Sequence, residues 1–168
     1  PILMAMPREE HDGEDVTTIT AETSTFDAEN NIVTFENYVK MVNEVKNMTM
    51  YCQILRVEMM EEGDQAASGE NASGIKLALA TGAVIIETIN EQGDLVVATA
   101  KQARFDMVNQ KVTLSDFPKI QDTNKRVDAI DPKTKIILTN AGQYWAEGPA
   151  RTTIIQDGVG AFTVRKPE

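Results

Sequence analysis

The fold is decided by a stretch that occurs twice: residues 20–35 read TAETSTFDAENNIVTF, and residues 99–114 read TAKQARFDMVNQKVTL. Seven positions are identical between the two copies, at a constant offset of 79 residues. Weaker copies of the Phe105-Asp106 pair follow at steps of 25 residues, as Ile130-Asp131 and Ile155-Gln156. Stacked repeats share one core and one continuous surface. We therefore predict a repeated β unit, and we expect its function to lie along that surface.

Each copy shows the alternation of apolar and polar residues that is typical of β-strands. From Val16 onward Thr, Val, Ile and Phe are enriched, and turn residues separate short apolar runs. Residues 29–31, 109–110, 131–134 and 157–158 contain the Asn, Asp, Gly or Pro that tight turns require, so we interpret them as hairpin tips. The predicted strands are 17–26, 31–42, 47–59, 74–80, 83–90, 94–106, 110–121, 125–130, 134–139, 143–147, 150–156 and 160–165.

Alternation also predicts that one face of the sheet is apolar. Val33 and Phe35 share a face, as do Met50 and Cys52, whereas positions between them are mostly polar or small. No helix is predicted to cover this face. An all-β protein of this kind must fold its sheet on itself or pack it against a second sheet.

Composition and charge narrow the function classes. The chain has 168 residues, of which 42% are hydrophobic, which fits one domain with a core. Its net charge of −10 argues against nucleic acid as a partner. Residues 1–96 carry 5 Lys and Arg against 18 Asp and Glu, whereas residues 97–168 carry 11 against 8. Ends of opposite sign favour head-to-tail association of copies, and a plain solvated surface is the alternative.

Two segments depart from the strand pattern. Residues 1–15 are charge-dense after an apolar start and are predicted to be an extended lead-in, so the β-repeat domain covers 16–168. Residues 61–74 form an acidic, Gly- and Ser-containing insertion that we predict to be a mobile loop. The chain begins at a proline, so we expect that any targeting segment has been removed.

The sequence offers little material for catalysis. His11, the only histidine, lies in the charged lead-in, and Cys52, the only cysteine, has apolar neighbours typical of a buried position. No motif for a metal, a phosphate loop or a nucleophile is found. We therefore predict no catalytic residue, no metal and no cofactor, and a protein that is not an enzyme.

The repeated unit, together with IKLALATGAVII at residues 75–86, resembles the OstA-like family of periplasmic lipopolysaccharide-transport proteins, which includes LptA and LptC. The resemblance covers roughly residues 16–165. It implies a single twisted, folded antiparallel sheet, a V-shaped β-jelly roll whose two leaves enclose an apolar groove. It also implies a periplasmic protein that shields the acyl chains of lipopolysaccharide and stacks end to end with similar β-domains into a bridge between membranes.

An apolar groove of this kind holds lipid without charged contacts, because burial stabilises each CH₂ by about 0.8 kcal/mol. Several methionines, including Met48, Met50 and Met107, suit irregular cargo, although core filling is the alternative interpretation. The predicted lipid-groove residues are Ile19, Phe26, Val33, Phe35, Met41, Met50, Ile54, Val57, Leu77, Leu79, Val84, Ile86, Phe105, Val112, Leu114, Phe117, Ile120 and Ile137.

Three functions remain open from sequence. The first is a lipid-binding bridge domain that takes lipopolysaccharide or another acyl lipid and joins partners through unpaired strands near 17–26 and 150–165. The second is a structural β-repeat protein that assembles through its sheet edges around a closed core. The third is a carbohydrate-binding accessory domain in which Tyr144 and Trp145 form an aromatic platform.

Overall fold

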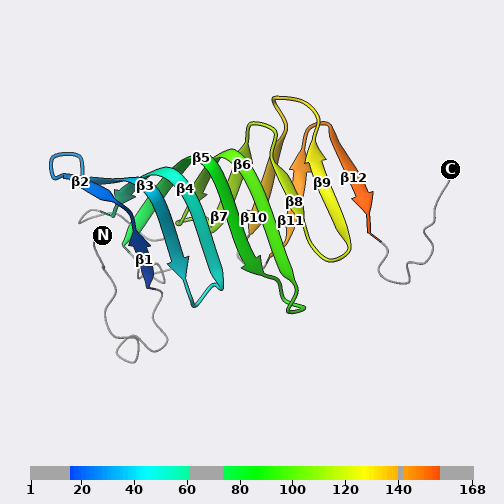
Figure 1. Ribbon diagram of the computed structural model, residues 1–168, viewed down its shortest axis with the longest axis horizontal. Helices are drawn as coiled ribbons and strands as arrows, with labels where there is room; N and C mark the ends of the chain where they lie inside the picture. The colour runs from blue at the N-terminus through cyan, green and yellow to red at the C-terminus, as the bar shows by residue number, and fades with distance from the viewer. Residues whose placement is uncertain (1–15, 61–73, 140–141, 156–168) are drawn as a thin grey trace.

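The computed structural model describes residues 16–60, 74–139 and 142–155, and these residues form a single antiparallel sheet (Figure 1). The strands are β1 (Thr17–Thr20), β2 (Thr23–Asp27), β3 (Ile32–Asn43), β4 (Met48–Met59), β5 (Ile75–Ile89), β6 (Leu95–Asp106), β7 (Lys111–Ser115), β8 (Lys119–Gln121), β9 (Lys125–Ala129), β10 (Lys135–Thr139), β11 (Tyr144–Glu147) and β12 (Ala150–Ile154). The predicted all-β, single-sheet fold is confirmed.

Several predictions lie outside the described residues. These are the lead-in at 1–15, the acidic insertion at 61–74 except for Gly74, the hairpin tip at 157–158 and the strand at 160–165. Within the described residues, no helix is long and apolar enough to cross a membrane.

The sheet branches at two strands, and the branches divide it into two leaves. β3 pairs with β2 along Ile32–Glu36 and with β1 along Lys40–Asn43. β6 pairs with β8 along its first half and with β7 along its second half. The first leaf therefore contains β2, β7, β10 and β11, the second contains β1, β8, β9 and β12, and the long strands β3 to β6 run through both.

The long strands bend where one leaf passes into the other. Pairing shifts register between Glu36 and Val39, between Tyr51 and Ile54, and between Thr81 and Val84. Backbone φ is positive at Gly82 (86°) and Ala83 (50°), which matches the local distortion of a β-bulge. These irregularities line up across β3, β4 and β5, so the sheet folds along one line and places the two leaves face to face.

The hydrophobic core lies between the two leaves. Phe105 and Leu114 of the first leaf and Met50 and Ile86 of the second belong to one buried cluster. Figure 1 shows β7, β10 and β11 behind β6, β8 and β9, as this arrangement requires. The sheet thus hides its apolar face by folding on itself, without a second sheet.

Four predicted strands differ from the structure. The predicted strand 17–26 is divided at Ala21 and Glu22, because β1 and β2 belong to different leaves. The predicted strand 110–121 breaks at residues 116–118, where φ is positive at Asp116 (71°) and Phe117 (56°). Conversely, the strands predicted at 74–80 and 83–90 are the continuous strand β5, because Gly82 bends it without ending it.

Short strands form both ends of the sheet. β1 and β2 pair only with β3, β11 pairs only with β10, and β12 pairs only with β9. Each end therefore has one free strand edge per leaf within the described part of the chain. The predicted edge positions near 17–26 and 150–165 are confirmed for the described residues, and β11 adds a further edge.

Candidate functional site

The inner face of the first leaf carries a row of apolar side chains from end to end. Directly paired residues of neighbouring strands share a face. Pairing runs from Phe26 through Val33 and Val57 to Ala78, and then along Phe105, Val112, Leu138 and Tyr144. This row, which we call the first-leaf row, is buried along its centre and starts and ends on edge strands.

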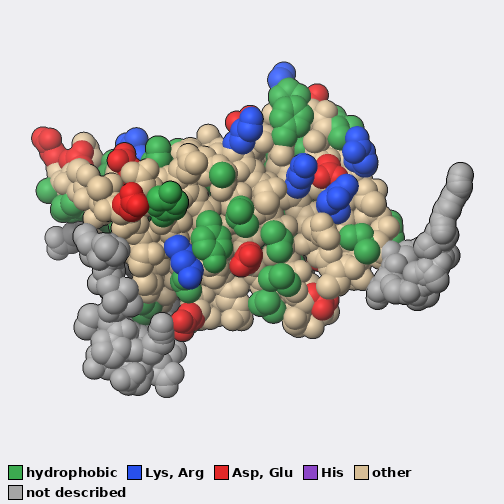
Figure 2. Space-filling view, in the orientation of Figure 1, with side chains coloured by type: hydrophobic (Ala, Val, Ile, Leu, Met, Phe, Trp, Pro, Cys, Tyr) green, Lys and Arg blue, Asp and Glu red, His purple; other side chains and the backbone are tan. Residues whose placement is uncertain are grey.

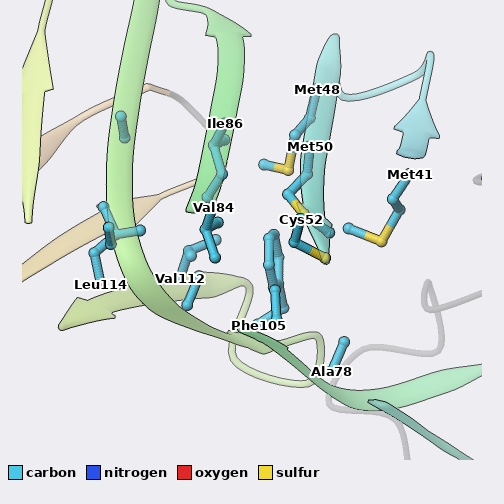
Figure 3. Close-up of a cluster of buried hydrophobic side chains, with 14 of the residues drawn as sticks. Met41, Met48, Met50, Cys52, Ala78, Val84, Ile86, Phe105, Val112 and Leu114 are labelled. Carbon is cyan, nitrogen blue, oxygen red and sulfur yellow. The ribbon is translucent and has the colours of Figure 1, made fainter. Parts of the chain in front are cut away.

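The second leaf carries a matching row that contains methionines. It runs along Ile19, Met41, Met50, Ile86, Ala98, Ile120, Val127 and Thr152, which we call the second-leaf row. Figure 3 shows Met50 and Cys52 of β4 close to Phe105, which comes from the other leaf. The two rows thus face each other and form an apolar interior along the length of the fold.

Twelve of the predicted groove residues contribute to this interior. They are the buried Ile19, Phe35, Met41, Met50, Val57, Val84, Ile86, Phe105, Val112, Leu114 and Ile120, with the half-buried Val33 packed against them.

Three predicted residues lie on the outer face because a bulge changes the phase of alternation. In β4 the register shift between Tyr51 and Ile54 turns Ile54 outward and Leu55 inward. In β5 a shift at the pairing of Met59 with Ile75 leaves Ala78 and Ala80 inside, so Leu77 and Leu79 are on the outside and half-buried. The expected interior position of Ile54, Leu77 and Leu79 therefore differs from the structure.

The remaining three differ for separate reasons. Phe26 belongs to the first-leaf row, yet its side chain is 58% exposed because no strand lies beyond β2. Phe117 lies at the bend between β7 and β8 and is 48% exposed. Ile137 is buried, but it pairs with Thr113 and Trp145 on the outer face, so Ile136 and Leu138 are the inward residues of β10.

Sequence reasoning missed several inward residues. Leu55, Ile136 and Leu138 are fully buried in the core. In β10, Ile136, Ile137 and Leu138 are three consecutive apolar residues. Alternation alone therefore cannot decide whether Ile137 or its two neighbours point inward. Leu55 had no local signal, because its phase depends on the bulge before it.

At one end of the interior, a polar contact joins the two leaves. The Tyr144 hydroxyl donates a hydrogen bond to Asp122 Oδ2 at 2.7 Å, and Asp122 follows β8 of the other leaf. Lys125 Nζ lies 3.6 Å from the same carboxylate and 5.0 Å from the centroid of the Tyr144 ring. Burial, together with the hydrogen bond and charge of Asp122, raises the pKa of Tyr144. The hydroxyl therefore remains a donor at neutral pH.

The repeated Asp and Asn of the sequence motif close hairpin tips. Asp106 Oδ1 accepts the Asn109 backbone N–H at 3.0 Å, and Asn109 Nδ2 donates to Asp106 Oδ2 at 2.8 Å. Asp27 and Asn30 make the same pair of contacts. The hydrogen bond from the Asn30 side chain lowers the pKa of Asp27 most strongly. These carboxylates thus have a structural role at the hairpin tips.

The interior approaches the surface between the hairpin tips. A small depression there is lined from the second leaf by Met41 and Met48, and from the first leaf by Phe105, Met107 and Val112. Among the described residues no cluster of His, Cys, Asp and Glu fits a metal ion. Cys52 is buried, and burial raises the pKa of its thiol to about 11.

Comparison with known proteins bears on this arrangement. No model of a known protein family and no curated protein matches the sequence. Among solved structures, the chain is similar to that of LptH, the LptA homologous periplasmic component of the conserved lipopolysaccharide transport device from Pseudomonas aeruginosa. The TM-score is 0.66 over 88% of this chain and 99% of LptH, at 11% sequence identity. The chain has the LptH fold. The resemblance to LptA-like proteins is thereby confirmed for the fold, including the folded β-jelly roll.

Tyr144 and Trp145 lie on opposite faces of β11. Tyr144 packs against the core, whereas Trp145 is 46% exposed and donates from Nε1 to Glu147 at 3.1 Å. Adjacent residues of a strand point to opposite sides of the sheet. The predicted aromatic platform therefore does not form from these two rings.

Proposed function

We propose that this chain is a periplasmic, non-enzymatic lipid-binding domain of a lipopolysaccharide-transport bridge. Its LptH-like fold supports the proposal, and the observation that carries it is the pair of apolar rows that face each other along the whole fold. The acyl chains of lipopolysaccharide would replace contacts between these rows. Sugar and phosphate groups would stay in solvent, so an acidic protein tolerates an anionic cargo.

The residues between the leaves suit a site that alternates between empty and filled. Met41, Met48 and Met50 are buried on the second leaf, and unbranched thioether side chains repack readily around irregular apolar shapes. Phe105 faces them from the first leaf (Figure 3). A lipid chain between these residues would exchange one apolar contact for another, so the main energetic cost is the separation of the leaves.

The two ends of the fold suit stacking with similar domains. Phe26 extends the first-leaf row to an exposed edge at one end, and Tyr144 ends the same row on β11 at the other. A neighbour that added its strands to these edges would continue both the hydrogen-bonded sheet and the apolar interior. We propose that head-to-tail copies or related β-domains join in this way.

Photo-crosslinking from neighbouring positions tests the lipid site. Met50 and Tyr51 are adjacent in β4, but Met50 is fully buried in the interior and Tyr51 faces outward at 37% exposure. Benzoylphenylalanine placed at Met50 should crosslink to added lipopolysaccharide upon irradiation. The same group at Tyr51 is the matched control and should crosslink weakly.

The same experiment distinguishes the second candidate function, a structural β-repeat protein with a closed core. That candidate is favoured by the complete burial of Met50, Leu114 and Leu138. It predicts no crosslink at Met50 while the copies still assemble through their edges. Crosslinking at Tyr51 without crosslinking at Met50 would mean that lipid binds only to the outside, and the proposed interior site would be wrong.

A further inference from the structure

Thr88 is a buried polar residue on the otherwise apolar inner face of the second leaf. It pairs with Met48 and Val96, and its side chain is 2% exposed. Its hydroxyl has no hydrogen-bond partner, and it is the one buried side-chain polar atom of the described residues in this state. The other buried polar side chains are paired: Asn43 donates to Thr17, Thr134 to the Pro149 carbonyl, and Asp128 accepts from Arg126.

An unpaired hydroxyl at this position destabilises the fold, and a valine side chain would fill the same space. Valine has almost the same shape as threonine and carries no polar atom to desolvate. A buried polar atom without a partner therefore calls for an explanation, and one explanation is a partner that arrives with a ligand.

The surroundings of Thr88 indicate which ligand atom that is. Pairing joins Thr88 to Met48 and Val96, and joins Met48 to Asn43, so these four residues form the last inward row of the second leaf before the hairpin tips at 44–47 and 90–94. The position thus lies where the apolar interior meets the polar rim. An amphiphile that enters the interior has its acyl linkage at such a boundary.

The neutral residues around Thr88 disfavour an anionic partner. Asn43, Met48 and Val96 of the same inward row carry no charge. A phosphate or a free carboxylate there would be buried without a cation, whereas a neutral carbonyl oxygen accepts a hydrogen bond without that penalty. We infer that the Thr88 hydroxyl donates a hydrogen bond to the ester or amide carbonyl of a bound acyl lipid. This inference rests on the proposed function, because it requires lipid between the leaves.

Two amphiphiles that differ in the group joining the alkyl chain to the headgroup test the inference. Dodecanoyl-N-methylglucamide has an amide carbonyl next to its alkyl chain, and dodecyl maltoside has an ether oxygen instead. Binding of each, below its micelle concentration, is measured for the wild type and for Thr88→Val by displacement of a fluorescent fatty-acid probe. We expect Thr88→Val to weaken the amide amphiphile about fivefold and to leave the ether amphiphile unchanged.

Two further variants complete the design. Thr88→Ser keeps the hydroxyl and should restore binding of the amide amphiphile, while Thr99→Val removes a hydroxyl from the outer face of the same leaf and should change nothing. The thermal midpoint of Thr88→Val should equal or exceed that of the wild type. A lower midpoint, or equal effects of Thr88→Val on both amphiphiles, would overturn the inference and leave the proposed function intact. If the wild type bound neither amphiphile, the proposed lipid site would itself fail.

Discussion

Single side chains decide how firmly the two leaves are held together at the β11 end. The Tyr144 hydroxyl reaches Asp122 of the other leaf at 2.7 Å, and Lys125 supports the same carboxylate. Gly142 adds a close approach at the neighbouring tip, since a Cβ there would lie 2.7 Å from Asn90 Cα. These contacts join residues that are far apart in the sequence, so no local sequence motif predicts them.

Tyr144→Phe should remove the hydrogen bond between the leaves and retain the ring. Because the acceptor is a carboxylate, we expect a loss of roughly 1–2 kcal/mol in the free energy of unfolding, measured by urea denaturation at pH 7. The raised pKa of Tyr144 means that its contribution is complete below about pH 10 and is lost above it, so the difference from the wild type should shrink there.

Trp145→Phe is the matched control for this change. Its hydrogen bond to Glu147 is exposed and lies within one strand, so its loss should cost much less. Equal losses for the two variants would show that the contact between the leaves contributes no particular stability.

At the scale of elements, the sequence predicted the positions of the strands but not the positions of their bends. Alternation located most strands to within two residues, because period-two burial is a local signal. A bulge inserts one residue and reverses the phase beyond it, as Ile54 and Leu77 illustrate. Bulges depend on how neighbouring strands fold together, so the assignment of faces failed at Ile54, Leu77 and Leu79. Met41 and Val84, beyond the bends of β3 and β5, nevertheless lie on the predicted inner face. The apolar interior was therefore predictable as a feature, but not in every residue.

The bend of β5 depends on Gly82. Its φ is 86°, and a Cβ there would lie 2.9 Å from Gln53 Cβ. Gly82→Ala therefore adds a close contact to the strain of a positive φ and should lower the free energy of unfolding by roughly 2–3 kcal/mol.

Gly93 provides the control because it shares the backbone angle without the contact. Its φ is also 86°, and no heavy atom lies within 4 Å of a built Cβ. Gly93→Ala should cost only about 1 kcal/mol in the same urea titration. A Gly82→Ala variant as stable as Gly93→Ala would show that the fold line does not need the close packing at residue 82.

At the scale of the whole molecule, charge is unevenly divided between the two ends. Figure 2 shows acidic side chains over β2 and its hairpin tip, and basic side chains over β8, β9 and β12. Glu22, Asp27 and Glu29 are exposed at the first end, and Arg126 and Arg151 at the other. The counts of acidic and basic residues in the two halves of the sequence predicted this division. In the fold, the two groups of charged residues lie at opposite ends of the sheet.

Head-to-tail association should therefore weaken with salt. Light scattering on concentrated protein should detect oligomers at low ionic strength and fewer of them near 1 M salt, where the screening length falls to about 3 Å. Arg151→Glu should reduce association, and the added change Glu22→Lys should restore it by exchanging the signs. A protein that stays monomeric at low salt and high concentration would contradict the proposed stacking.

The core side chains between the two leaves are buried in this structure, so lipid entry requires the leaves to separate. The most direct measurement of this opening is the distance between spin labels on facing hairpin tips, with Val45→Cys on the second leaf and Asn109→Cys on the first. Both positions are exposed, and the buried Cys52 is replaced by Ala. Pulsed electron paramagnetic resonance should show a distance distribution that moves several ångströms outward when lipopolysaccharide is added. An unchanged distribution in protein saturated with bound lipopolysaccharide would contradict the proposal that lipid occupies the space between the leaves.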